Sequence, residues 1–245
     1  MKDTLVIVPT YNEKENICAI IEAILAQEKA FDVLVVDDNS PDGTGALVKG
    51  VQEQFGDRVQ LLERNEKSGL GTAYIAGFEY AIEKGYDYIF EMDADFSHNP
   101  ADLIRLYQTC SNDGFDVAVG SRYATGVNVV NWPMGRVLLS YFASQYVQFV
   151  TGMPIRDSTA GFVCYKRKVL ETIPLEKIRF IGYAFQIEMK FTALKYGFGI
   201  KEVPIIFTNR TKGTSKMSTG IFSEAFFGVI LMKWRSLWKN YKQEN

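Results

Sequence analysis

Short runs of β-branched residues alternate with helix-length segments through the first half of this sequence, and this alternation constrains the fold more than any other feature. The pattern is typical of βαβ units, in which parallel strands form one sheet and helices cover its faces. It predicts strands at Thr4–Val8, Phe31–Val36, Val59–Leu62, Tyr88–Met92 and Asp116–Gly120. It predicts intervening helices at Glu15–Glu28, Thr44–Gln54, Thr72–Lys84 and Pro100–Asn112. We therefore expect an α/β fold with a mostly parallel sheet flanked by helices.

The second half of the sequence is less regular. We expect strands at Phe162–Lys166 and Lys201–Phe207, and a helix at Phe185–Lys195. Two further stretches, Val137–Val150 and Ile221–Trp238, are strongly apolar but are interrupted by polar residues. Neither has the roughly 20 consecutive apolar residues that a transmembrane helix needs, so we expect no transmembrane span. Both suit helices that lie in a membrane interface, although packing on the core or on a second subunit explains the periodicity equally well.

Charge and cysteine content narrow the functional class. The net charge of -2 argues against a protein that coats nucleic acid, which needs a basic surface to neutralise phosphates, so we expect no nucleic-acid partner. The three cysteines are far apart and form no CxxC pair, so they suggest neither a zinc site nor a disulfide framework and favour a reducing compartment. The first residues lead directly into a strand-like run without the features of a signal peptide, so we expect a cytosolic protein.

Polar residues follow the first two predicted strands, where ligands bind in open α/β sheets. The first strand ends in VPTYNE, and the ring of Tyr11 and the carboxylate of Glu13 suit a nucleobase. The same residues also suit a plain helix start capped by Asn12. The second strand ends in two adjacent carboxylates, and Asp37 is expected to accept hydrogen bonds from ribose hydroxyls.

The fourth predicted strand ends in the sequence EMDAD. Asp93 and Asp95 are two residues apart, so in an extended segment both carboxylates point to one side and reach the same hard cation. We expect Mg²⁺ or Mn²⁺ there, bound together with a diphosphate. His98 is the only histidine, and we expect it to cap the following helix or to lie in solvent.

Basic residues follow later strands. Arg122 comes directly after the fifth predicted strand, and Arg210 and Lys216 bound the cationic segment RTKGTSK. Such a segment suits a loop that closes over phosphates, although many similar loops are only solvated surface.

Eight motifs in this order resemble the family 2 glycosyltransferases, which have a GT-A fold, and within them the dolichyl-phosphate mannose synthase group. They extend over almost the whole chain: VPTYNE (8–13), VVDDNSPDGT (35–44), GLGTAY (69–74), MDADFSHNP (92–100), GSRY (120–123), DSTAGF (157–162), FQIEM (185–189) with Tyr183, and RTKGTSK (210–216). The resemblance implies that the nucleoside of GDP-mannose binds at Pro9, Tyr11, Glu13, Val35 and Asp37. It implies that Asp93, Ala94 and Asp95 bind ribose, diphosphate and metal, that Arg122, Arg210 and Lys216 bind the donor phosphates, and that Arg136 and Ser140 bind the acceptor phosphate.

The reaction expected from this resemblance is an inverting transfer of mannose from GDP-mannose to a polyprenyl monophosphate of the dolichyl type. The acceptor phosphate has a second pKa of about 6 and is largely anionic at neutral pH, so no dedicated general base is needed. The residues expected to act are Asp95, Arg122, Arg136, Ser140 and Asp157, and Asp157 is expected to orient the sugar or an arginine. Two alternatives remain open: another donor such as UDP-glucose, or a catalytically silent scaffold of the same fold.

The expected organisation follows from the same resemblance. Residues 1–216 form the glycosyltransferase catalytic domain, including an interface helix at about 136–151, and residues 217–245 form a C-terminal amphipathic helix. We expect a peripheral protein on the cytoplasmic face of a membrane. Its partners would be the nucleotide-sugar donor, the polyprenyl phosphate acceptor, the membrane surface and either a membrane-anchoring subunit or a second copy of the chain.

Overall fold

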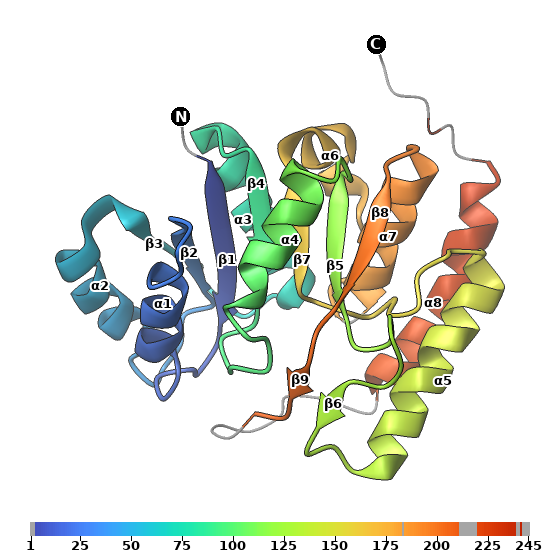
Figure 1. The fold of residues 1–245 in the computed structure, drawn as a ribbon, viewed down its shortest axis with the longest axis horizontal. Coiled ribbons are helices and arrows are strands. Elements are labelled where there is room, and N and C mark those ends of the chain that lie inside the picture. Colours follow the sequence, from blue (N-terminus) through green and yellow to red (C-terminus); the bar gives the residue numbers. More distant parts are fainter. Residues whose placement is uncertain (1–2, 183, 211–219, 239–240, 242–245) are drawn as a thin grey trace.

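Seven strands form the central sheet, in the order β3-β2-β1-β4-β7-β5-β8 (Figure 1). The computed structural model describes residues 3–182, 184–210, 220–238 and 241. Within this sheet only β7 is antiparallel to its neighbours, β4 and β5. The strands are β1 (Thr4–Thr10), β2 (Asp32–Asp37), β3 (Val59–Glu63), β4 (Tyr88–Glu91), β5 (Val117–Ser121), β7 (Val163–Lys166) and β8 (Ile200–Pro204). The expected mostly parallel sheet is therefore confirmed.

Helices cover both faces of the sheet. They are α1 (Ile17–Leu25), α2 (Thr44–Phe55), α3 (Leu70–Lys84), α4 (Asp102–Ser111), α6 (Arg167–Thr172) and α7 (Ala184–Lys195), with short 3-10 turns at Gly56–Arg58 and Leu175–Lys177. The apolar faces of α1, α2 and α4 share one core cluster with the sheet, and those of α3, α6 and α7 share the other. β1 and β2 are apolar on both faces because both faces are covered.

Gly71 explains part of the GLGTAY motif through packing. A Cβ atom at this position would lie 2.8 Å from the Phe180 carbonyl oxygen and 2.8 Å from the Phe185 ring. The Gly71 amide also donates to the Ile181 carbonyl at 2.8 Å. A glycine is therefore required for the start of α3 to approach the segment that leads into α7.

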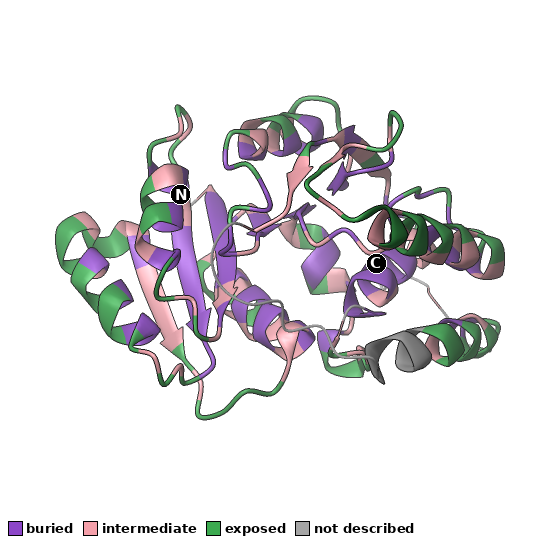
Figure 2. Cartoon of the chain, turned by 90° about the horizontal axis from the view of Figure 1, so that it is seen from below, coloured by how far each residue is buried: buried purple, intermediate pink, exposed green. Residues whose placement is uncertain are grey.

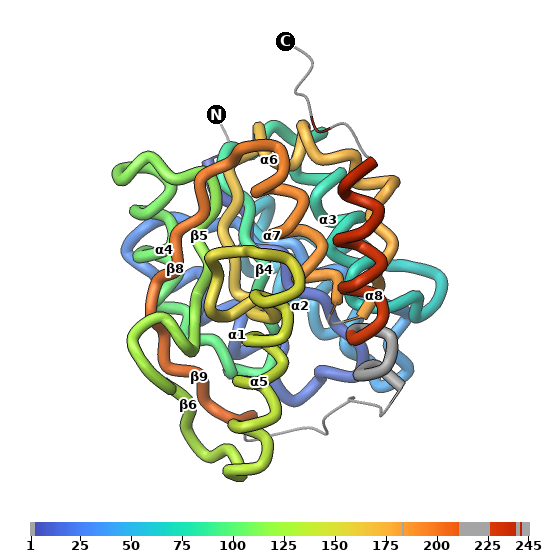
Figure 3. Tube along the Cα trace, turned by 90° about the vertical axis from the view of Figure 1, so that its right-hand side faces the viewer, coloured from blue at the N-terminus to red at the C-terminus, as the bar shows by residue number. Residues whose placement is uncertain are grey.

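Two helices, α5 (Met134–Thr151) and α8 (Gly220–Ser236), lie side by side at one end of the sheet (Figures 1 and 3). They run in the same direction, since Tyr146 stacks on Phe226 with ring centroids 4.6 Å apart and the Lys233 ammonium donates to the Thr151 carbonyl at 2.9 Å. Their inner faces share a small apolar cluster with α7.

The outer faces of α5 and α8 remain apolar and exposed (Figure 2). The large apolar side chains exposed on or just after these helices are Met134, Leu138, Leu139, Tyr141, Phe142, Phe149, Phe226, Phe227, Ile230, Leu231, Trp234, Leu237 and Trp238. We call this set the α5–α8 apolar face. Within the described residues, no helix combines the length and the apolar character needed to cross a bilayer.

The expected strand Lys201–Phe207 is split in two. β8 ends at Pro204, and β9 (Phe207–Thr208) pairs instead with β6 (Val129–Val130) in a second, two-stranded sheet. Pro204 has no N–H to extend the ladder, and Ile205 makes the last bond to β5, through the Ser121 carbonyl at 3.0 Å. The chain then leaves the sheet and carries residues 207–210 below its carboxyl edge, next to the start of α5 (Figure 1).

Candidate active site

The carboxylate of Asp37 is anchored at the carboxyl end of β2. It is buried and accepts hydrogen bonds from the Thr10 hydroxyl at 2.7 Å, the Ser40 hydroxyl at 2.6 Å and the Ser40 amide at 2.9 Å. The adjacent Asp38 forms an ion pair with Arg64 at 2.9 Å. These contacts fix both carboxylates, and the oxygens of Asp37 keep acceptor capacity, because a carboxylate has roughly four lone-pair sites.

The loop after β1 lies beside this carboxylate. The Glu13 amide donates to the Thr44 hydroxyl at 3.0 Å, and the Lys67 ammonium lies 4.4 Å from the centre of the Tyr11 ring. Asn12 has a φ of 57° and donates its amide to Ser40, and α1 begins only at Ile17. Asn12 is thus a left-handed turn residue and does not cap the helix.

The other two residues expected at the nucleoside, Pro9 and Val35, lie within strands of the sheet. Pro9 pairs with Val36 near the end of β1, whereas the Val35 side chain is fully buried in the core. Sequence reasoning did not single out a nearby hollow of about 540 Å³, which is lined by Arg64, Asn65, Glu66, Ser68 and Thr72.

Asp93 and Asp95 follow β4, two strands away from β2 in the sheet. Asp95 is almost completely buried, accepts from the Ser97 amide at 3.0 Å and forms an ion pair with Arg210 at 2.9 Å. Burial and then the neighbouring Asp95 raise the pKa of Asp93, while Arg210 acts in the opposite direction. The structure therefore brings Arg210 to Asp95, and the rest of the segment RTKGTSK lies outside the described residues. Ala94, between the two carboxylates, is buried.

These two carboxylates fit a divalent cation that is shared with a phosphate ligand. Among the described residues, no three His, Cys, Asp or Glu side chains form a metal-binding group. Magnesium is commonly bound through one or two carboxylates together with substrate phosphates and water, and this donor set matches that mode. The negative charge that raises the pKa of Asp93 is also the charge that a cation neutralises.

His98 is buried, so the expectation that it caps a helix or lies in solvent is wrong. Its ring stacks on Phe162 with centroids 4.8 Å apart, and its Nδ1 accepts from the Asp93 amide at 3.3 Å. Burial lowers its pKa, which keeps the ring neutral. The His98 ring thus supports the backbone of the segment that carries Asp93 and Asp95.

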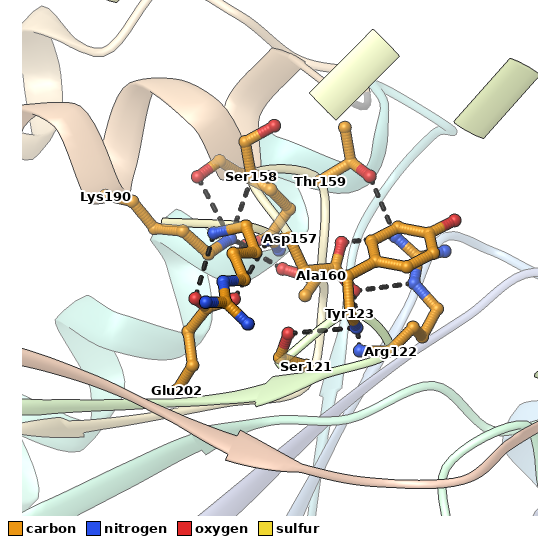
Figure 4. Close-up of polar contacts among 11 residues, drawn as sticks. Ser121, Arg122, Tyr123, Asp157, Ser158, Thr159, Ala160, Lys190 and Glu202 are labelled. Carbon is orange, nitrogen blue, oxygen red and sulfur yellow. Dashed lines mark hydrogen bonds and ion pairs between the residues drawn. The ribbon is translucent and has the colours of Figure 1, made fainter. Parts of the chain in front are cut away.

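Arg122 and Asp157 form a buried, bidentate ion pair (Figure 4). The Asp157 carboxylate accepts from Arg122 Nε at 2.7 Å, from Nη2 at 2.5 Å and from the Arg122 amide at 2.8 Å. The Asp157 amide donates to Glu202 at 2.9 Å, and Arg122 also contacts the Thr159 hydroxyl at 2.9 Å. Asp157 therefore orients an arginine, which is one of the two roles expected for it.

Lys190 is a buried residue that sequence reasoning missed. Its ammonium donates to the carbonyls of Ser158 at 3.3 Å and Ala160 at 2.6 Å, and so fastens the segment that carries Asp157 to α7 (Figure 4). Gln186, one helical turn earlier, donates to Glu91 at the end of β4 at 2.5 Å. Burial lowers the pKa of Lys190 and raises that of Glu91. The signal in the sequence was a lysine inside the otherwise apolar stretch after FQIEM.

Arg136 and Ser140 lie on one face at the start of α5, four residues apart. Arg136 donates to the Asn209 side-chain carbonyl at 3.1 Å, and its guanidinium lies 4.0 Å from the centre of the Trp132 ring. Asn209 immediately precedes Arg210, so the acidic pair and the start of α5 are joined through two consecutive residues. Lys216 lies outside the described residues.

Comparison with known proteins fits this geometry. The sequence model of "Glycosyl transferase family 2" matches residues 5–174. The chain is a family 2 glycosyltransferase. This glycosyltransferase is 47% identical to the polyprenol monophosphomannose synthase of Mycolicibacterium smegmatis, over 92% of this chain and 85% of the relative. It is 41% identical to the undecaprenyl-phosphate mannosyltransferase of Micrococcus luteus, over 95% of this chain and 96% of the relative.

Solved structures confirm the GT-A type of fold. The glucosyl-3-phosphoglycerate synthase of Mycobacterium tuberculosis, in complex with Mn²⁺, UDP and glucosyl-3-phosphoglycerate, superposes with a TM-score of 0.68 over 96% of this chain and 80% of that chain. The identity is 15%, so this likeness concerns the fold alone. The identification as an enzyme of sugar transfer rests on the family and the closer relatives.

Proposed function

We propose that this glycosyltransferase transfers mannose from GDP-mannose to a polyprenyl monophosphate of the dolichyl type, with inversion at the sugar C1. The observation that carries the proposal is the ion pair between Asp95 and Arg210, which joins the acidic edge of the sheet to the residue after Asn209, the residue that contacts Arg136 of α5. The polyprenol monophosphomannose synthase and the undecaprenyl-phosphate mannosyltransferase to which the chain is similar support the sugar and the acceptor.

The donor side would be formed by β1, β2 and β4. Tyr11 and Glu13 offer a ring and a carboxylate for the base, and Asp37 offers a fixed acceptor for ribose hydroxyls. The hollow beside Arg64 adjoins this group through the pair of Arg64 with Asp38. Pro9 in β1 and the backbone of Val35 in β2 would lie beneath the nucleoside.

A divalent cation, Mg²⁺ or Mn²⁺, would be bound by Asp93 and Asp95, beside Ala94. When bound, it would neutralise the charge of the departing nucleoside diphosphate. Arg210, already paired with Asp95, would contribute positive charge to the same diphosphate, and Lys216 is assigned to this group by the resemblance alone.

The acceptor side would be formed by the start of α5. Arg136 and Ser140 share one face there, and Leu139, three residues after Arg136 and therefore its neighbour on the helix surface, exposes apolar surface for a prenyl chain. An oxygen of the acceptor phosphate would attack C1 without a general base, because it is already largely anionic at neutral pH. The Asp157 carboxylate already accepts hydrogen bonds from Arg122, which agrees with a reaction in which Asp157 takes no proton.

We further propose that the α5–α8 apolar face rests on the cytoplasmic face of a membrane. It presents several large exposed apolar side chains, including Trp234 and Phe142. Amphipathic helices of this type lie in the plane of the interface. A membrane-anchoring subunit or a second copy of the chain remains a competing occupant.

The decisive experiment measures the product. Purified protein is incubated with GDP-mannose or UDP-glucose, with a short polyprenyl phosphate, and with or without Mg²⁺ or Mn²⁺, and the lipid is identified by mass. We expect a polyprenyl phosphate that carries mannose to form from GDP-mannose only in the presence of a divalent cation. Equal or better transfer from UDP-glucose would replace the proposed donor, and no lipid product with any donor would reject the proposed reaction.

Replacement of the metal carboxylate tests the site directly. Asp95→Ala is expected to lower kcat by at least about a hundredfold, because charge stabilisation at the leaving group is worth several kcal/mol. Asp113→Ala removes an exposed carboxylate elsewhere and is the matched control. Retention of full activity in the Asp95 variant would contradict the assigned metal site.

A further inference from the structure

The ring of Trp132 lies under two arginines of the site. The guanidinium carbon of Arg136 is 4.0 Å from the ring centre, and that of Arg122 is 5.5 Å from it. Trp132 lies between β6 and α5, in the segment that brings Arg136 to the site. Attraction between a guanidinium and an indole face is the strongest of its kind and restricts where the cation can lie. The position of Arg136 therefore depends on this ring.

The surroundings of Trp132 hold the ring in place. Phe207 meets it edge to face with centroids 5.3 Å apart, and Phe207 belongs to β9, which pairs with β6. Directly after β9, the Asn209 backbone amide donates to the Val130 carbonyl of β6 at 3.1 Å, while the Asn209 side chain accepts from Arg136. The pairing of β6 with β9 thus holds the Trp132 ring, the Asn209 side chain and the Arg136 guanidinium in place.

The indole N–H of Trp132 is buried, and among the described residues it has no hydrogen-bond partner. A buried donor without a partner costs about 1–3 kcal/mol, and tryptophan N–H groups normally find one. Here the donor belongs to a ring that lies beneath two guanidinium groups. An anionic oxygen would satisfy the donor and the cations together.

We propose that Trp132 is a binding residue for the acceptor phosphate: its ring supports Arg136, and its indole N–H donates to a phosphate oxygen. This inference rests on the proposed function and deepens it. The acceptor is favoured over the donor as the source of the phosphate because Leu139, exposed three residues after Arg136 and beside it on the surface of α5, offers apolar surface for a lipid chain.

Two variants separate the two contributions of the side chain. Trp132→Phe keeps an aromatic face and removes the N–H, whereas Trp132→Leu removes both. We expect the KM for a short polyprenyl phosphate to rise at least about tenfold in the first variant and about a hundredfold in the second, since a hydrogen bond to a charged group is worth about 1.5–3 kcal/mol. The KM for GDP-mannose is expected to stay within about twofold, a change well below the energy of one hydrogen bond.

Phe55→Leu is the matched control, since it removes a half-buried ring at the far end of α2. This control variant shows how a general loss of packing affects the KM for each substrate, and we expect both KM values to stay unchanged. If Trp132→Leu does not fold, Trp132→Phe decides. An unchanged acceptor KM in Trp132→Phe, or an equal rise for donor and acceptor, would overturn the proposal.

Direct binding distinguishes failure of this inference from failure of the proposed function. The same polyprenyl phosphate is titrated into wild-type and variant protein by calorimetry, without any donor. Binding by wild-type protein that weakens in Trp132→Phe supports the inference even if no sugar is transferred. Equal affinities, or no binding by the wild-type protein, would reject it.

Discussion

The buried pair of Arg122 and Asp157 gives the sharpest test of how the site is held together. Asp157→Asn keeps the shape of the side chain and removes its charge. In the folded protein the carboxylate is fully buried and accepts three hydrogen bonds from Arg122, whose side chain is only 10% exposed. The variant removes the carboxylate charge that faces a buried guanidinium. Loss of one partner of such a pair lowers the free energy of unfolding by about 3–5 kcal/mol.

A double-mutant cycle measures this coupling. Unfolding in urea is followed for Asp157→Asn, Arg122→Met and the double variant. We expect a coupling energy of about 3 kcal/mol, with the double variant more stable than Asp157→Asn alone, because an apolar side chain leaves no unpaired charge. The single variant should melt roughly 6–20 °C lower, at about 2–4 °C per kcal/mol for a domain of this size.

The exposed pair of Lys49 and Glu63 is the matched reference. Its side chains are 56% and 54% exposed, and the same cycle should give less than about 1 kcal/mol. A coupling energy for Arg122 and Asp157 no larger than that of the exposed pair would refute the reasoning. Arg122 would then not be held by Asp157 in solution, and the orienting role of Asp157 would have to be withdrawn.

Two further predictions concern stability and membrane binding. Lys190→Met should lower the free energy of unfolding by about 2–4 kcal/mol, because the carbonyls of Ser158 and Ala160 lose their donor. Lys177→Met, at an exposed position, should change it by less than about 0.5 kcal/mol. Equal losses for the two variants in urea unfolding would contradict the role of Lys190. Trp234→Ser should weaken flotation with anionic vesicles about tenfold, because burial of a large side chain is worth about 1.5–3 kcal/mol. Leu47→Ser, which removes a comparably exposed apolar side chain from α2, should leave flotation unchanged, and identical binding by both variants would contradict contact of the α5–α8 apolar face with lipid.

The sequence predicts the main sheet well because its strands carry a strong local signal. β1 and β2 are continuous apolar runs, and the polar residues after them mark where they end. The antiparallel direction of β7 has no such signal, since it depends on how β4 and β5 accept a strand from later in the chain. The two-residue strands β6 and β9 are too short to show any periodicity.

The candidate site was predictable where it depends on strand ends. Asp37 and Asp95 lie at one edge of the sheet because the carboxyl ends of parallel strands meet there. The contacts that support this edge were not predictable, because they join residues distant in sequence. His98, which the sequence predicts to cap the following helix or to lie in solvent, stacks on Phe162, and the Lys190 ammonium donates to a carbonyl 30 residues earlier. The local sequence around a polar residue does not reveal which distant partners will bury it.

The three arginines of the site are restrained in chemically different ways, and this difference bears on how substrates bind. Arg122 is held by a buried carboxylate, and Arg136 contacts an amide and an aromatic ring. Arg210 instead pairs with Asp95, the carboxylate proposed to bind the cation. Asp95 cannot give its full charge to both partners, so cation binding and release of Arg210 toward a diphosphate are linked through one carboxylate. Arg136 contacts Asn209 and Trp132, whereas Asp95 pairs with Arg210, so the proposed acceptor site predicts that the acceptor phosphate binds before the donor site is occupied.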